Sequence, residues 1–193
     1  IAVANYLSRV GHTISDNDLK NWEDLAESFN ISNISNSPSK FDADQLLFWQ
    51  KKAVESLSIE ESGKWLDGQL NNLPSTVDKG HFVTLIIDNI NFPEEAGNYI
   101  ENLFLNPRVS DEFIDSAGKD FFLKSHEVIS SDITNWNDIT KAIGEKTSKK
   151  GKELFMPLRV AITGLTYGPE LDKVFDLIGK DKILDRLKEV SEL

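Results

Sequence analysis

The apolar residues of this chain recur at three- and four-residue spacing, which is the period of an amphipathic α-helix. No stretch alternates apolar and polar residues as a half-buried β-strand does. The spacing is clearest near the C-terminal end, where Gly179 separates two apolar stripes. The first stripe consists of Leu171, Val174, Phe175 and Ile178, and the second of Ile183, Leu184, Leu187 and Val190. The pattern predicts an all-α fold, a helical bundle or cage without a sheet, in which ridges of side chains pack into grooves.

Capping residues predict where the helices of the first part begin and end. Asp42 is a good N-cap, and Phe41 before it can form a hydrophobic staple with Leu46. Ser58 caps the next helix, and Glu61 three residues later completes a capping box. The helices expected here span 2–10, 21–29, 42–57 and 59–70, with Gly11 ending the first, and the polar segment 30–40 is expected to be irregular.

The segment Leu73-Pro74-Ser75 predicts a division of the chain into two helical subdomains, 1–73 and 74–193. Pro74 disfavours helix at the residue before it, and Ser75 can cap a helix over 76–90. Pro93 is expected as the first residue of another helix. Further helices are expected over 110–129, with Ser110 as the cap and a break near Gly118, and over 132–143, ahead of Gly144.

Composition excludes several classes of protein. The 193 residues include no cysteine, so there is no disulfide, no thiol chemistry and no thiolate metal site, which fits a reducing cytoplasm. No apolar run is long enough to span a bilayer. The net charge of −11 argues against a general nucleic-acid binder. Because the chain opens on Ile1-Ala2-Val3 without an initiator methionine, we expect it to be part of a longer protein.

One segment of this acidic chain is basic. Between residues 141 and 159 the basic residues are Lys141, Lys146, Lys149, Lys150, Lys152 and Arg159, against Glu145 and Glu153 alone. A local basic patch on an acidic body can bind one defined RNA while repelling other polyanions. A core helix with a solvated lysine face is the structural alternative.

A turn is expected after this basic segment. Gly164 and Gly168 punctuate it, and a second amphipathic helix is expected to start at Pro169. Within the helix before the turn, Pro157 would cost about 3 kcal/mol at an interior position. We therefore expect Pro157 in the first turn or at a kink, with the regular helix over 158–163.

The same residues carry a resemblance to a known family. The string reads KGK from Lys150 to Lys152, MPLRVAITG from Met156 to Gly164, GPEL from Gly168 to Leu171 and LIGK from Leu177 to Lys180. It resembles the C-terminal end of bacterial glutamyl-tRNA synthetases. Near the start, Asn5 to Gly11 is similar to the family's NYLxxLG segment, and Ser35 to Leu47 to its serine-rich loop running into FDxxKL. Trp49 is followed by Gln50, where the family usually has asparagine.

The resemblance implies a function for the chain and for its parent. The parent would be a cytoplasmic glutamate–tRNA ligase that uses ATP and Mg²⁺ in its catalytic domain, whose HIGH and KMSKS signatures are absent here. This chain would therefore hold no cofactor and would not aminoacylate alone. Residues 1–73 would form a stem-contact region and 74–193 an anticodon-binding domain. The implied partners are glutamate tRNA and, as a second possibility, glutamine tRNA, with no membrane, and we expect a monomer.

The resemblance also implies binding residues. Arg159 would contact an anticodon base, and the turn from Gly168 to Leu171 would line the same pocket. Asn89 aligns where discriminating members carry an arginine that reads the third anticodon base, so the parent would also charge glutamine tRNA. The remaining residues expected to bind RNA are Lys149, Lys150 and Lys152. The structural alternatives are a surface ion pair of Arg159 with Glu170 or Asp172, and a helix C-cap for Asn89.

The residues themselves indicate no catalytic centre. His12, His81 and His126 are far apart in sequence, and none has another histidine at metal-binding spacing, so no metal site is expected. A different class of function stays open at this point, an acidic all-helical protein-interaction module without RNA binding. Salt distinguishes the two, because RNA affinity falls steeply with ionic strength.

Overall fold

The computed structural model describes residues 1–105, 107, 109 and 111–192. All regular structure in these ranges is helical, apart from an isolated antiparallel bridge between His12 and Ile34. The prediction of an all-α fold is therefore confirmed. The expected cap Ser110 lies outside the described residues. In the described part of the chain, no helix is both long and apolar enough to cross a membrane.

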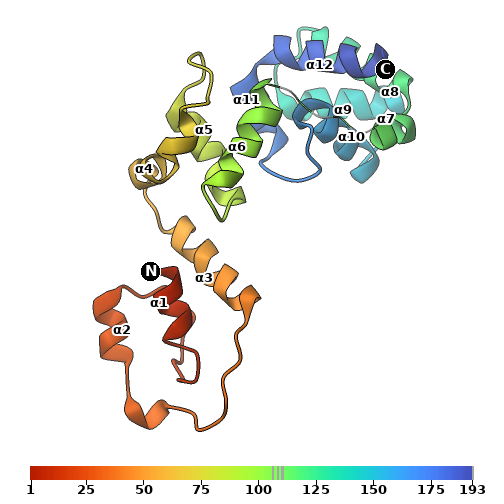
Figure 1. Ribbon diagram of the computed structural model, residues 1–193. Coiled ribbons are helices and arrows are strands. Elements are labelled where there is room, and N and C mark those ends of the chain that lie inside the picture. Colours follow the sequence, from red (N-terminus) through yellow and green to blue (C-terminus); the bar gives the residue numbers. More distant parts are fainter. Residues whose placement is uncertain (106, 108, 110, 193) are drawn as a thin grey trace.

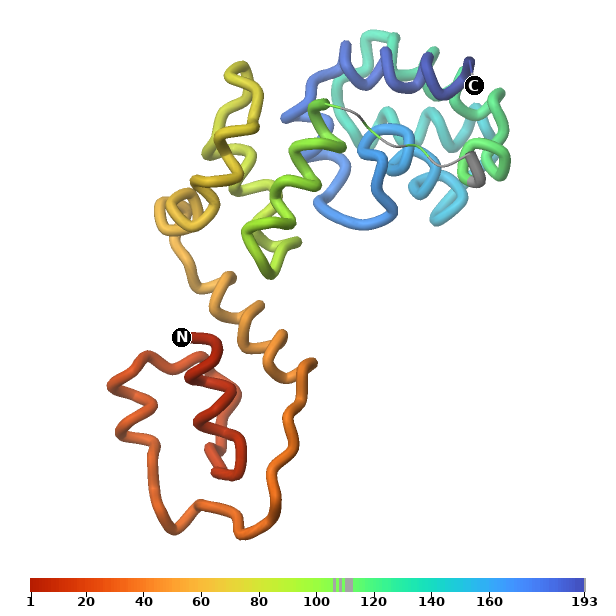
Figure 2. Tube along the Cα trace, viewed as in Figure 1, coloured from red at the N-terminus to blue at the C-terminus, as the bar shows by residue number. Residues whose placement is uncertain are grey.

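The first helices form a separate group at one end of an elongated molecule (Figure 1). They are α1 (Ala2–Leu7), α2 (Trp22–Ser28), the 3₁₀ turn η1 (Ile31–Asn33) and α3 (Ala43–Glu55). Figure 2 shows the long connection between α2 and α3 passing around α1. Helix α3 packs on α1 and leads into the rest of the fold, so it joins the two ends of the molecule.

The remaining helices form the larger part of the molecule. Its middle consists of α4 (Ile59–Leu70), α5 (Lys79–Ile86), the 3₁₀ turn η2 (Ile87–Asn89), α6 (Glu94–Ile100) and the π-helical turn η3 (Glu101–Leu105). Its end consists of α7 (Asp111–Ala117), α8 (Lys119–Ser130), α9 (Trp136–Thr147), α10 (Lys152–Thr163), α11 (Leu171–Ile178) and α12 (Lys180–Glu192). Gly118, with φ +81°, separates α7 from α8 as the sequence predicts.

Two of the predicted N-caps are confirmed. The Asp42 carboxylate accepts from the backbone N–H groups of Asp44 and Gln45. Ser58 and Glu61 form the complete capping box, and the Ser58 hydrogen bonds hold the pKa of Glu61 below its usual range. These short-range bonds satisfy helical N–H groups that have no partner within the helix.

Several helix boundaries differ from the predictions because a competing cap or turn is used. Asp78 rather than Ser75 caps α5, and Asn135 caps α9, which extends through Gly144 to Thr147. The first helix ends at Leu7, four residues before Gly11. The other shifts are smaller: Pro93 is the N-cap of α6 rather than its first residue, and α11 begins at Leu171, with Glu170 rather than Pro169 before it.

Pro157 is the sixth residue of α10, past its first turn. The expectation that the regular helix begins at Leu158 is therefore wrong. The proline removes the N–H that would donate to Glu153, close to the helix start. Its ring is buried and lies between the buried side chains of Leu154 and Leu158 in sequence. Burial of an apolar ring offsets part of the cost of the missing hydrogen bond.

The segment similar to the family's NYLxxLG forms the centre of the first group of helices. The side chain of Asn5 donates to the Lys20 carbonyl (2.7 Å) and accepts from the Lys20 N–H (2.9 Å). The hydroxyl of Tyr6 accepts from the N–H of Asp42 (2.7 Å), and the Arg9 guanidinium lies 4.0 Å from the centre of the Trp49 ring. These contacts hold α1, α3 and the intervening loop together.

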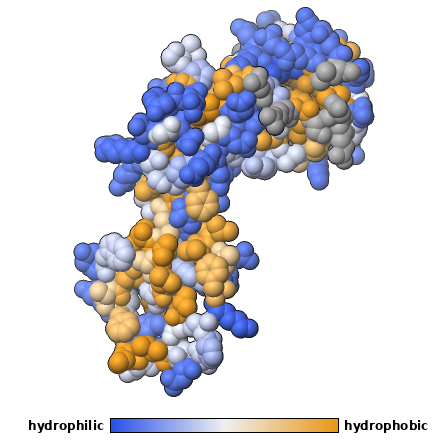
Figure 3. Space-filling model, in the orientation of Figure 1, coloured by the Kyte–Doolittle hydropathy of each residue, from blue (hydrophilic) through white to orange (hydrophobic). Residues whose placement is uncertain are grey.

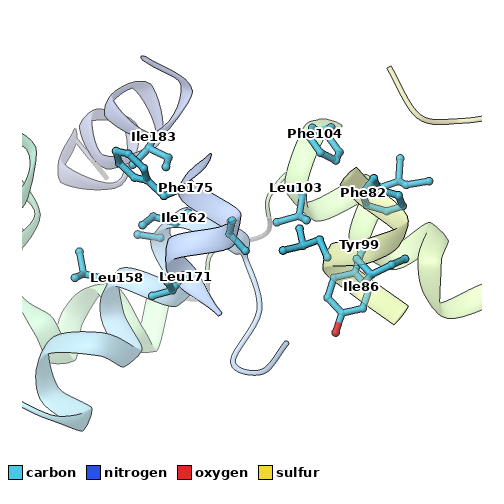
Figure 4. Packing of buried hydrophobic residues seen from close by; sticks show 14 of the residues in the cluster. Phe82, Ile86, Tyr99, Leu103, Phe104, Leu158, Ile162, Leu171, Phe175 and Ile183 are labelled. Atoms are coloured by element: carbon cyan, nitrogen blue, oxygen red, sulfur yellow. The ribbon is translucent and has the colours of Figure 1, made fainter. Parts of the chain in front are cut away.

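The buried side chains form two clusters. The smaller one contains Ala2, Tyr6 and Trp49, and the larger one runs from Val54 on α3 to Val190 on α12. Figure 4 shows the larger cluster continuing from α10 and α11 across to α5 and α6. Gln50 and Lys51 on α3 donate to the Asn91 and Asp88 carbonyls, which fixes the end of α3 beside η2. The proposed boundary at Leu73-Pro74 stays a prediction.

Large apolar side chains are exposed mainly in the first group of helices. Figure 3 shows apolar surface over that end of the molecule. The exposed residues there include Val3, Leu7, Trp22, Phe29, Phe41 and Phe48. The predicted stripe of α2 is therefore buried only at Leu25, and the apolar Phe41 contacts the ring of Tyr6 edge-on.

A buried arginine joins three helices of the larger part. Arg186 on α12 is 4% exposed, and its guanidinium donates to the carbonyls of Ile162, Asn102 and Leu103. Burial lowers the pKa of Arg186 to about 10. The end of α10 and the π-helical turn after α6 are thereby tied to the same side chain.

Candidate nucleic-acid interface

The turn between α10 and α11 is shaped by two glycines. Gly164 caps α10 at φ +68°, and Gly168 has φ +123°, both in regions that favour glycine. The hydroxyl of Thr163 accepts from the Leu165 N–H (3.1 Å), which closes the start of the turn. In Figure 1 this turn projects beside α6. The turn therefore brings residues of the matched motif against a helix that is about 70 residues earlier in the chain.

Arg159 projects from α10 toward this turn. Its Nη1 donates to the carbonyl of Pro169 (2.8 Å), and its side chain is half-buried. Burial lowers the pKa of Arg159, and the neighbouring Tyr99 opposes that shift. Glu170 pairs instead with Lys173 (2.6 Å), and among the described residues Arg159 forms no ion pair. The ion-pair alternative is therefore wrong, and the guanidinium keeps N–H donors for a ligand.

Tyr99 on α6 lies directly under the turn. Its side chain is 2% exposed, and its hydroxyl has no hydrogen-bond partner among the described residues. A Cβ atom at Gly168 would lie 3.1 Å from both Oη and Cε1 of Tyr99. Burial, Tyr167 and Glu95 raise the pKa of Tyr99 to about 12, with Arg159 opposing them. The hydroxyl is therefore neutral near pH 7.

Exposed aromatic and cationic side chains are present on α10 and in the turn that follows it. Tyr167 in the turn is 60% exposed. On α10, Lys152 and Arg159 are seven residues apart, so they share one face about 10 Å apart along the helix axis. The exposed Phe155 lies between them in sequence. Aromatic faces beside cations are the groups that single-stranded RNA loops use for stacking and for phosphate contact.

The predicted lysines are in different environments. The Nζ of Lys149 donates to the Ala117 carbonyl (2.8 Å) and lies 4.9 Å from the Phe121 ring centre, so its charge is used inside the fold. Lys146 pairs with Glu127. Lys150 and Lys152 are exposed, and Lys150 lines a surface hollow of about 550 Å³ between α9 and α10.

Asn89 is the last residue of η2, and it is partly exposed. The C-cap of α5 is Ile87 and that of η2 is Ile90, so the helix C-cap explanation for Asn89 is wrong. The neighbouring Asp88 helps Glu170 and Asp172 to raise the pKa of Lys173. The structure thereby brings η2 close to the first turn of α11.

Gly168 and Leu171 occupy opposite ends of the predicted pocket wall. Gly168 is part of the surface, whereas Leu171 is 6% exposed and belongs to the core. The sequence alone did not indicate Tyr99 or Tyr167 as binding residues. The spacing of Tyr99 on α6 is explained by burial alone, and nothing local signals its approach to Gly168.

In the described part of the chain, no group of three or more His, Asp or Glu side chains could hold a metal ion.

Comparison with known proteins places this site in a family. Residues 120–191 match the anticodon binding domain family, and they include Arg159 and the turn. Glutamate–tRNA ligase 1 of Halorhodospira halophila is 37% identical over 199 residues, covering 100% of this chain and 41% of that protein. Glutamate–tRNA ligase 2 of Acidithiobacillus ferrooxidans is 34% identical, covering 96% and 39%.

The fold has a counterpart among solved structures. A glutamate–tRNA synthetase from Elizabethkingia anophelis superposes with a TM-score of 0.78 at 17% identity, over 100% of this chain and 40% of that one. The chain thus spans about 41% of the length of the first relative above. Together the motif, the fold and the matched segment show that the chain is similar to the anticodon-binding part of glutamate–tRNA ligases.

Proposed function

We propose that this chain recognises the anticodon loop of glutamate tRNA for a glutamate–tRNA ligase. The observation that carries the proposal is Arg159, which is half-buried, bonded to the Pro169 carbonyl and free of any carboxylate among the described residues. A charge that is partly desolvated without an ion-pair partner is expensive unless a ligand uses it. The residue lies inside the segment that matches the anticodon binding domain family.

The proposed mode of binding follows from the chemistry of an unpaired loop. Anticodon bases are unstacked and can be read on their edges, and Arg159 offers a planar fork of donors for that purpose. The exposed ring of Tyr167 supplies a face on which a base can stack. Lys150 and Lys152 are the exposed cations available for phosphate oxygens.

We further propose that the parent protein attaches glutamate to tRNA in the cytoplasm with ATP and Mg²⁺. Those ligands belong to the catalytic part of such enzymes, and no step here involves them. The chain is proposed to act as a monomer. Asn89, the last residue of η2, supports a second specificity, for glutamine tRNA, because an asparagine lacks the charged fork of the expected arginine.

Binding of anticodon stem–loop RNAs at several salt concentrations tests the proposal. We expect the glutamate stem–loop to bind more tightly than one with an unrelated anticodon, and its affinity to fall as salt rises. Arg159→Ala should weaken the specific complex about tenfold or more, since a base contact of this kind contributes about 1–3 kcal/mol. Equal binding of glutamate and glutamine stem–loops would support the second specificity.

Lys188→Ala is the matched control. Lys188 is exposed on α12, so its loss changes the net charge by the same amount as Arg159→Ala does. The control should leave the preference for the glutamate anticodon unchanged. If the wild-type chain binds all stem–loops equally, or binds protein partners without salt dependence, the anticodon proposal is wrong.

A further inference from the structure

The hydroxyl of Tyr99 is a polar group without a structural role in the described fold. Its side chain is 2% exposed, yet its oxygen neither donates to nor accepts from any described group. Burying a hydroxyl without a partner is unfavourable, and phenylalanine would fill the same space without that cost. Figure 4 shows the hydroxyl at the end of the ring that points away from Leu103 and Phe104, its neighbours in the core.

The α10–α11 turn lies close to this hydroxyl. The Cα of Gly168 approaches so closely that an added Cβ would lie 3.1 Å from Oη. Gly164 and Gly168 bound the turn with φ +68° and +123°. Glycines tolerate large changes in backbone torsion, so binding of an RNA loop can shift the turn between them.

We propose that the Tyr99 hydroxyl is a specificity-determining group of this pocket, which hydrogen-bonds an anticodon base when the bound RNA loop displaces the turn. The proposal rests on the proposed function, because it assigns a further residue to the same site. Tyr99 lies outside residues 120–191, so it adds α6 to the binding surface.

The chemistry of Tyr99 complements that of Arg159. A guanidinium can only donate, whereas a neutral phenol donates one hydrogen and also accepts. The two groups lie close enough for each to influence the other's pKa. Together they suit a base edge that carries a donor next to an acceptor, such as the imino N–H and carbonyl of uracil. Arg159 alone would bind any base edge that carries suitable hydrogen-bond acceptors.

The experiment compares Tyr99→Phe with the wild-type chain in thermal unfolding and in stem–loop binding. We expect an equal or higher Tm, because an unpaired buried hydroxyl is removed. We expect affinity for the glutamate stem–loop to fall about fivefold, the value of one ordinary hydrogen bond. With stem–loops substituted singly at each anticodon position, one substitution should abolish the difference between the two proteins, since both partners of the bond are then altered.

Tyr6→Phe is the matched control. The Tyr6 hydroxyl is buried but accepts from the Asp42 N–H (2.7 Å), far from this site. Its removal should lower Tm and leave RNA affinity unchanged, the opposite pattern. If the wild-type chain prefers the glutamate anticodon and Tyr99→Phe binds equally tightly, the Tyr99 inference is wrong while the proposed function stands. If the wild-type chain shows no preference, the proposed function itself fails.

Discussion

Gly168→Ala tests the packing on which the candidate site depends. The substitution adds one methyl group at φ +123°, a torsion that side chains rarely adopt and that costs of order 1–3 kcal/mol. The new Cβ would also meet Oη and Cε1 of the buried Tyr99 at 3.1 Å, and overpacking of this kind costs about 1–3 kcal/mol more. We expect the free energy of unfolding to fall by about 2–6 kcal/mol.

Gly118→Ala and Gly179→Ala separate the two contributions. These glycines have φ +81° and +86°, and an added Cβ would meet nothing within 4 Å at either position. The controls should therefore show only the torsional cost. Urea unfolding of the three variants gives the comparison. If Gly168→Ala is no more destabilising than the controls, the turn does not pack against Tyr99 as described, and the argument for this pocket loses its basis.

For two further perturbations, the structure determines whether the stability of the fold rises or falls. Arg186→Met leaves the carbonyls of Ile162, Asn102 and Leu103 without their shared donor, and should lower the free energy of unfolding in urea by about 3 kcal/mol; a loss below about 1 kcal/mol would contradict the structural role. Tyr99 has a pKa of about 12 in the folded chain, above the value near 10 expected when unfolded, because burial disfavours its anion. The unfolded chain therefore ionises first, and the free energy of unfolding falls as pH rises from 10 toward 12. The Tm of the wild-type chain should therefore fall relative to that of Tyr99→Phe over this range, and parallel pH profiles would refute the assignment.

Local signals predicted helix starts well where a second residue supported the cap. Phe41 precedes Asp42 and Glu61 completes the capping box of Ser58, and both Asp42 and Ser58 cap as expected. Ser75 competed with Asp78 three residues later, and the structure uses the aspartate. Capping energies of about 1 kcal/mol are similar for these residues, so tertiary packing decides between them. The sequence alone therefore does not indicate which of the two residues caps α5.

The candidate site likewise contains residues that the sequence indicated and one residue that it did not. Arg159 and the Gly168 turn are contiguous in sequence and were found through a motif. Tyr99 reaches the site because the fold places α6 beside the α10–α11 turn, and the burial of its ring in the core requires no binding role. What points to a binding role for Tyr99 is its hydroxyl, which is buried without a hydrogen-bond partner. That property can be recognised only in the folded structure.

The basic segment shows why a count of charges overstates a binding surface. Lys146 is neutralised by Glu127, and the ammonium of Lys149 is bound to the Ala117 carbonyl. Folding thus removes two of the cations that the sequence offers to phosphate. With so few free charges on a chain of net charge −11, long-range attraction cannot supply much of the affinity. Recognition must then rest on short-range contacts to the bases, which is the kind of contact that a fixed arginine and a buried phenol provide.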